Sequence, residues 1–297
     1  MKQKGVEFLK MNKIIKKKDK LSTNGIISLD YKPNVLQKTK IIGGFNPRIN
    51  EKGITELGEV LFEEENQIVL GGALFILEKI FGVTSPLLVD YLNNIMGIAT
   101  TGATVTEIYP KDTLVCLFGV GIGGAGDTIT SVLDVKFYER EIFDMVPFRV
   151  IDGALSAEDV EKYWFKKLLL DDKQAYYLKK FEAPPAIKVL WKDAEGDEDG
   201  TEVETGVHNT TRIEPIESFI ELILKISKTD VREWFELQGN IEQARINSIG
   251  LFTGIKSQLA DGTFDYKQVK LFSKLNIGNE LLQLAKDLTI IYRIYTS

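Results

Sequence analysis

Residues 216–227 read IESFIELILKIS, and the spacing of their apolar side chains is central to the fold assignment. On a helix these side chains would lie on one broad stripe: Phe219, Ile220, Ile223, Leu224 and Ile226. The spacing therefore predicts an amphipathic helix that packs on a core.

The rest of the C-terminal third extends this helical period. Thr229 is expected to cap a helix over Asp230–Leu237, and Gly239-Asn240 to end it. Further helices are expected over Ile241–Leu251, Tyr266–Leu275 and Glu280–Leu288. The segment Thr289–Tyr295 (TIIYRIY) predicts a closing strand.

The middle of the chain is rich in β-branched residues and predicts strands. They are expected over Ala103–Tyr109, Thr113–Phe118, Asp127–Phe137, Met145–Val150, Tyr176–Phe181 and Ala186–Trp191, with Val203–Val207 pairing with the last. Helices are expected over Gln67–Val83, Leu87–Met96 and, after the capping-box spacing of Ser156 and Asp159, Ala157–Leu170. In the first, the Gly71-Gly72 pair would let another backbone approach closely. Together these elements indicate an α+β fold with an extended N-terminal arm, a mixed or antiparallel β-rich middle and a helical C-terminal third that ends in a strand.

The N-terminal region differs in charge from the rest of the chain. Residues 1–40 hold eleven lysines and three acids, so they carry +8, whereas the net charge of the whole chain is −6 and the remainder carries −14. Between residues 21 and 66, breakers such as Asn24-Gly25 and Asn46-Pro47 interrupt short apolar pairs. We therefore expect a basic, extended arm over residues 1–66 that becomes ordered against neighbours, and an α+β body over residues 67–297 with a possible subdivision near residue 212.

Composition excludes several functional classes. One cysteine, Cys116, excludes a disulfide framework, and one histidine, His208, argues against a histidine-based zinc site or catalytic triad. No apolar run approaches the roughly 20 residues of a membrane span. We expect no catalytic residue, metal or cofactor and no membrane partner. The lysines expected to contact DNA or an acidic partner are Lys13, Lys16, Lys17, Lys18 and Lys20.

Residues 119–127, GVGIGGAGD, match the dinucleotide-binding pattern G-x-G-x-x-G twice. A nucleotide site needs a helix to follow these glycines, because the amides at its N-terminus bind the phosphates. The residues that follow, Thr128–Val132, are instead typical of a strand. A hairpin or subunit-contact loop is the favoured interpretation, and a nucleotide site is the alternative.

Two other segments carry candidate chemistry. Residues 193–204 hold seven acids in twelve positions, but neither register matches an EF-hand loop, so a solvated hairpin tip is favoured over a weak cation site. His208 is interpreted as a surface or turn residue and Cys116 as a small core residue. The aromatic pairs Trp164-Phe165, Tyr176-Tyr177 and Trp234-Phe235 are interpreted as core or interface anchors.

Three segments resemble virion structural proteins of large tailed bacteriophages. They are the arm Lys13–Asn66, the stretch EREIFDMVPFRV at 139–150, and YYLKKFEAPPAIKVLW at 176–191 with the acidic loop after it. The resemblance implies an assembly protein of the head, neck or tail, made in the host cytoplasm and located in the virion. Its partners would be copies of itself, other virion proteins and, through the arm, packaged DNA. The alternatives are a soluble enzyme that binds a nucleotide at residues 119–126 and a DNA-binding accessory protein.

Overall fold

In the computed structural model, the segment at 216–226 is not a helix but most of a long strand, β11 (Arg212–Ile226). Leu222, Leu224 and Ile226 alternate along one face of β11 and belong to the main core. Phe219 and Ile223 occupy the opposite face, and Phe219 is also buried. Because both faces of the strand carry apolar side chains, the apolar positions also fall three and four residues apart, as they would in a helix.

The structure describes residues 38–51, 53–84, 108–126, 131–169, 172–193, 198–202, 212–258, 260, 264–281 and 286–295. These residues belong to one compact unit, residues 36–297. The lysines of residues 13–20, the predicted helix Leu87–Met96, the predicted strand Val203–Val207 and His208 lie outside the described residues.

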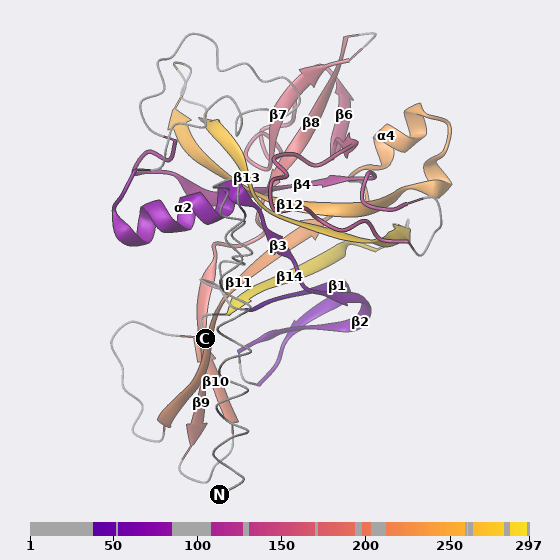
Figure 1. The fold of residues 1–297 in the computed structure, drawn as a ribbon. Coiled ribbons are helices and arrows are strands. Elements are labelled where there is room, and N and C mark those ends of the chain that lie inside the picture. The colour runs from indigo at the N-terminus through magenta and orange to yellow at the C-terminus, as the bar shows by residue number, and fades with distance from the viewer. Residues whose placement is uncertain are drawn as a thin grey trace, which may run out of the picture. The chain divides into compact units, whose positions relative to one another are not determined.

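Sheet A has the strand order β10-β9-β11-β14-β1-β2, and every pairing is antiparallel (Figure 1). Its other strands are β1 (Lys38–Ile49), β2 (Thr55–Glu64), β9 (Ala186–Asp193), β10 (Glu198–Glu202) and β14 (Leu288–Tyr295). β14, the last strand of the chain, lies between β11 and β1, so the sheet pairs strands that are far apart in the sequence.

Sheet B has the order β3-β13-β12-β4-β8-β6, with β5 also pairing with β4 and β7 with β8. The pairings here are antiparallel as well. Its strands are β3 (Gln67–Ile68), β4 (Leu114–Gly121), β5 (Met145–Val146), β6 (Arg149–Asp152), β7 (Tyr163–Leu168), β8 (Lys173–Lys180), β12 (Arg245–Gln258) and β13 (Phe264–Leu281). Helix α2 (Leu70–Phe81) packs against β13, and α4 (Arg232–Leu237) and the 3-10 turn η2 (Ile241–Gln243) join β11 to β12.

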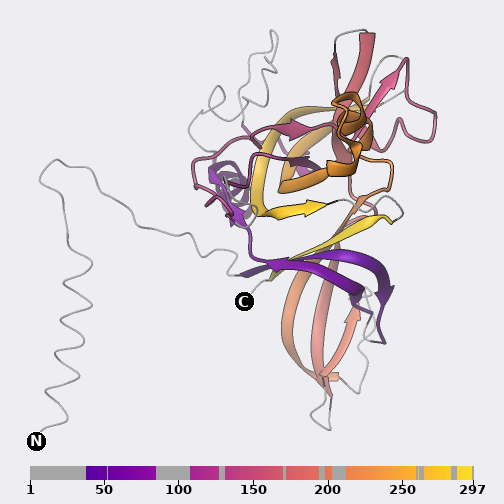
Figure 2. The same cartoon turned by 90° about the vertical axis from the view of Figure 1, so that its right-hand side faces the viewer.

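The main core lies between the two sheets. It contains Ile41 of β1 and Ile290 of β14 from sheet A, together with Phe118 of β4 and Leu251 of β12 from sheet B. A hydrogen bond of 2.9 Å also joins the hydroxyls of Ser273 on β13 and Tyr292 on β14. The sheets therefore pack face to face as a β-sandwich, which both views of the ribbon show (Figures 1 and 2).

The α+β prediction, with its helical C-terminal third, is wrong: the fold is β-rich with two antiparallel sheets. Residues 245–258, 264–281 and 212–226 are strands where the helices Ile241–Leu251, Tyr266–Leu275 and Ile216–Ser227 were expected. β12 lies between β13 and β4 and is buried over nine consecutive residues, 246–254. A strand buried on both faces has a continuous apolar run, which periodicity alone does not distinguish from a helix.

Two predictions in the middle of the chain are also wrong. The expected helix Ala157–Leu170 is a turn followed by β7. The predicted cap does form, since the amide of Asp159 donates to Ser156 Oγ at 3.2 Å, but the aromatic residues after it pair with β8 instead of continuing a helix. Of the expected strand Asp127–Phe137, the only described residue that pairs is Val132, in an isolated bridge with Ala125.

Several predictions are confirmed. β4, β5 with β6, β8, β9 and β14 coincide with expected strands, and α2 and α4 lie within expected helices, although Val231 and not Thr229 precedes α4. The Gly71-Gly72 prediction is also confirmed. A Cβ atom at Gly72 would lie 2.0 Å from the carbonyl oxygen of Phe272, so only glycines allow α2 to approach β13 this closely.

The expected irregular arm differs from the structure over residues 38–64. These residues form β1 and β2, which pair with each other, and β1 also pairs with β14. Asn46-Pro47, interpreted above as a breaker, lies inside β1, and the register of β1 with β2 shifts by one residue opposite Gly43-Gly44, which marks a β-bulge and not the end of an element. Neither α2 nor α4 nor any other helix among the described residues is long and apolar enough to cross a membrane.

Candidate functional site

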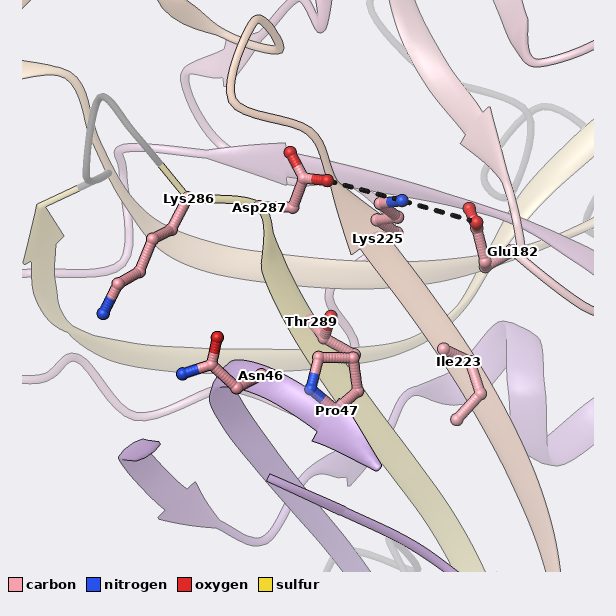
Figure 3. A pocket seen from close by; sticks show the side chains of 8 residues that line it. All are labelled: Asn46, Pro47, Glu182, Ile223, Lys225, Lys286, Asp287 and Thr289. Carbon is pink, nitrogen blue, oxygen red and sulfur yellow. Dashed lines mark ion pairs between the residues drawn. The ribbon is translucent and has the colours of Figure 1, made fainter. Parts of the chain in front are cut away.

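A cavity of about 380 Å³ lies where β1 separates from β14 (Figure 3). Its walls come from β1, β11, the start of β14 and the connection between β8 and β9. The residues that line it are Asn46, Pro47, Glu182, Ile223, Lys225, Lys286, Asp287 and Thr289.

The local sequence of β1 opens this cavity. β1 pairs with β14 from Lys38 to Gly44, and beyond Gly44 it pairs with β2 alone. At Gly44 an added Cβ atom would lie 1.9 Å from the carbonyl oxygen of Glu59, so the bulge requires glycine. Asn46 then adopts a φ of 57°, a left-handed conformation that asparagine tolerates better than most residues. Asn46 and Pro47 therefore line the cavity from a part of β1 that lies beyond its pairing with β14, which begins at Leu288.

The charges in the cavity are paired with one another. Lys225 Nζ lies 3.4 Å from Asp287 Oδ2 and 3.6 Å from Glu182 Oε1. Dashed lines in Figure 3 mark these two ion pairs. Lys286 Nζ lies 2.7 Å from Glu59 Oε2. Burial alone would raise the pKa of Asp287, but the amide of Lys228 and the ammonium of Lys225 outweigh it and hold that pKa below its ordinary value. All these groups are partly exposed, so each ion pair contributes little to stability.

This arrangement can bind a polar or charged group through its lysines, carboxylates and Thr289. A nucleophile needs a base within hydrogen-bond reach, and the cavity is lined by no histidine, cysteine or serine. Across the described part of the chain, no group of three or more histidine, cysteine or carboxylate side chains could hold a metal ion.

A second polar cluster lies under the turn that precedes α4. The carboxylate of Asp230 is fully buried and accepts hydrogen bonds from Lys179 Nζ at 2.5 Å, the hydroxyl of Tyr163 at 2.6 Å and the amide of Ser227 at 2.8 Å. Burial and the nearby Asp230 carboxylate raise the pKa of Tyr163 above its ordinary value. Because both carboxylate oxygens have partners, this cluster fastens α4 to sheet B and offers no group to a ligand.

A neighbouring network extends this attachment toward the surface. Arg149 Nη2 lies 3.0 Å from Glu233 Oε1, and Arg149 Nη1 lies 3.2 Å from Asp159 Oδ2. The other oxygen of Glu233 accepts the amide of Val150 at 2.7 Å. The network therefore joins α4, β6 and the turn before β7.

A third buried group is Lys270 on β13, which is fully shielded from solvent. Its ammonium donates to the carbonyl oxygens of Ile108 at 2.8 Å and Gln268 at 3.2 Å. Burial lowers the pKa of Lys270 to about 8, while the nearby Glu78 carboxylate acts in the opposite direction. With no solvent access, this lysine cannot reach a substrate.

The glycine-rich segment is packed against protein. A Cβ atom at Gly124 would lie 2.2 Å from the carbonyl oxygen of Asn247, and one at Gly123 would lie 2.7 Å from that of Phe143. The amide of Gly124 already donates to Asn247 Oδ1 at 2.7 Å. The space beside Gly123 and Gly124 is therefore filled by protein, which gives the nucleotide alternative no support.

The structure also locates other predicted residues. The acidic stretch contains β10, which pairs with β9, so part of this stretch is a strand and not only a hairpin tip. Cys116 packs against the second hydrophobic cluster, and burial raises its pKa to about 12, which agrees with the core interpretation. Trp164, Tyr176, Tyr177 and Phe235 are buried, as expected of core anchors.

Sequence reasoning missed the cavity and the four lysines discussed above, Lys179, Lys225, Lys270 and Lys286. The available signal was a charge inside an apolar strand, as at Lys225 within FIELILKI and Lys270 within QVKLFSKL. Such a charge must be paired or must reach the surface. No protein-family model, curated protein or solved structure matches this chain.

Proposed function

We propose that this protein is a non-enzymatic structural subunit that assembles with copies of itself and with other proteins of a tailed-phage virion, in its head, neck or tail. The observation that carries the proposal is an exposed apolar face on α2. Ile80 is 58% exposed and Phe81 65% exposed, with Leu77 one turn earlier on the same face. Contiguous apolar side chains of this size on a surface are typical of interaction sites.

The polar interior supports the same proposal. The buried charges at Asp230, Lys179 and Lys270 are engaged by groups of the fold itself, which suits a scaffold more than an enzyme. The virion assignment rests on the resemblance of the arm and of the segments at 139–150 and 176–191. The lysines from Lys13 to Lys20 are assigned in this proposal to contact with packaged DNA or an acidic neighbour.

Light scattering and negative-stain microscopy of the full chain test the proposal. The wild-type protein should form oligomers, rings or tubes, and the double variant Ile80→Ser/Phe81→Ser should reduce their mass while keeping the circular dichroism of a β protein. The matched control is Ile187→Ser/Leu237→Ser, which removes two exposed apolar side chains from β9 and α4. A wild-type chain that stays monomeric at every concentration and with every candidate partner would overturn the proposal.

A further inference from the structure

Strand β2 leaves an open edge ten residues long at one end of sheet A. It pairs with β1 on one side and is the last strand of sheet A on the other, as Figure 1 shows. β2 has ten residues, whereas the terminal strands β10, β6 and β3 have five, four and two, and β7, which pairs with β8 alone, has six. The outer side of an edge strand presents backbone amides and carbonyls to which another extended segment can bind.

The side chains of this edge are acidic. Residues 55–65 contain five glutamates and no lysine or arginine. Lys40 lies 2.8 Å from Glu63, and Lys286 pairs with Glu59. Glu64 and Glu65 are exposed and form no ion pair with any described residue, and the apolar Val60 on the same strand is 54% exposed. The edge therefore offers backbone partners, an apolar contact and uncompensated negative charge.

The chain carries a segment of matching charge. Residues 1–20 hold eight lysines against two acids, and Lys16, Lys17 and Lys18 are consecutive. We infer that the open edge of β2 binds the lysine-rich segment, residues 1–20, of a second copy of this chain, which adds to sheet A as an extra strand. This inference rests on the proposed assembly function and names the contact through which copies join.

Length and symmetry agree with such an exchange. Residues 21–37 connect the lysine-rich segment to β1 and span at most about 60 Å when extended, which is enough to reach a neighbouring molecule. Each copy would donate one segment and accept another through a different surface. A donor–acceptor contact of this type joins copies head to tail into a ring or a filament.

The acidic side chains also disfavour the competing contact. If two β2 edges paired with each other, their glutamates would face like charges, which is destabilising. A basic segment has the opposite charge and is selected over a second acidic edge. The other edge strand of sheet A, β10, is acidic too, but it is half as long as β2.

Charge exchange between two full-length variants tests the inference. The first variant, Glu64→Lys/Glu65→Lys, has a basic edge and a basic segment. The second, Lys16→Glu/Lys17→Glu/Lys18→Glu, has an acidic edge and an acidic segment. Each alone should lose assembly by light scattering, whereas a mixture should regain it, because each edge then meets a segment of opposite charge. Assembly of the wild-type chain should weaken as salt is added.

The matched control is Glu198→Lys/Asp199→Lys, which makes the same charge change on β10. It should assemble like the wild type, and loss of assembly in this control alone would assign the contact to β10 and overturn the inference. The inference would also be overturned if each exchange variant assembled alone as well as the wild type does, or if the mixture of the two failed to assemble. Both results would leave the proposed function standing. A monomeric wild-type chain would instead contradict the proposed function itself.

Discussion

The ammonium of Lys179 lies 2.5 Å from a carboxylate oxygen of Asp230, and the two side chains are 8% and 0% exposed. Lys179 is on β8 of sheet B, whereas Asp230 follows β11 of sheet A. The rings of Phe148 and Tyr163 also lie within 6 Å of the ammonium. One ion pair therefore ties the two sheets together where the chain passes from β11 to α4.

Removal of this carboxylate should destabilise the protein strongly. Asp230→Ala leaves the Lys179 ammonium buried without its partner, which typically costs about 3–5 kcal/mol of unfolding free energy. Urea denaturation of the variant and the wild type measures the difference. The matched control is Asp134→Ala, since Asp134 is 88% exposed and its ion pair with Lys136 should contribute less than about 1 kcal/mol. Equal effects at the two positions would contradict the role given to Asp230.

The contact between α2 and β13 predicts a second, steric effect. Gly72→Ala places a methyl group 2.0 Å from the carbonyl oxygen of Phe272. To relieve this contact, the backbone of α2 or of β13 would have to move. We expect a loss of roughly 1–3 kcal/mol, measured by thermal or urea denaturation. Gly278→Ala on β13 is the control, because its nearest neighbour is a flexible glutamate atom 3.7 Å away. If Gly72→Ala proves as stable as this control, α2 does not pack on β13 as described.

The left-handed residue at the cavity wall predicts a third effect. Asn46 has a φ of 57°, and alanine is less tolerant of that conformation than asparagine or glycine. Asn46→Ala should therefore lower the unfolding free energy by about 1 kcal/mol, whereas Asn46→Gly should stay close to the wild type. If Asn46→Gly had a lower unfolding free energy than Asn46→Ala, the side chain of Asn46, and not its backbone conformation, would determine stability at this position.

How far the sequence predicts this fold depends on whether a segment is buried on one face or on two. β14 was predicted because TIIYRIY is short and β-branched, and the close approach at Gly72 followed from a glycine pair inside an apolar run. β11 was mistaken for a helix because it carries apolar side chains on both faces, and β12 because both of its faces are buried; either arrangement obscures the period of two. In β11, Glu221 and Lys225 held a further clue. In a strand they lie on the face opposite Leu222 and Leu224, where Glu221 meets Arg293 and Lys225 meets Asp287.

The cavity could not be predicted, for a different reason. Its walls come from residues 46, 47, 182, 223, 225, 286, 287 and 289, and no local pattern links these positions. Only the pairing of β14 between β11 and β1 brings them together. Sheet order in an antiparallel fold depends on long-range contacts, which the periodicity of single segments does not encode.

Lys270 predicts a pH dependence of stability. Folding lowers the pKa of Lys270 from 10.5 to about 8, because burial disfavours the charged ammonium. Between these two values the unfolded chain binds more protons than the folded chain, so the contribution of Lys270 to stability rises with pH across that window. Below about pH 8 the protein bears the full cost of burying the charge. The nearby Glu78 carboxylate reduces this cost but does not remove it.

Comparison with Lys270→Met isolates this contribution, since methionine fills a similar volume without a charge. From about pH 7 to about pH 10, the difference in unfolding free energy between the two proteins should shift by roughly 1–3 kcal/mol in favour of the wild type. Lys267→Met, at an exposed position on the same strand, is the control and should follow the wild type at every pH. Urea denaturation at several pH values measures all three proteins. A difference between Lys270→Met and the wild type that stays constant with pH would mean that Lys270 remains charged in the folded protein, and the depressed pKa would be wrong.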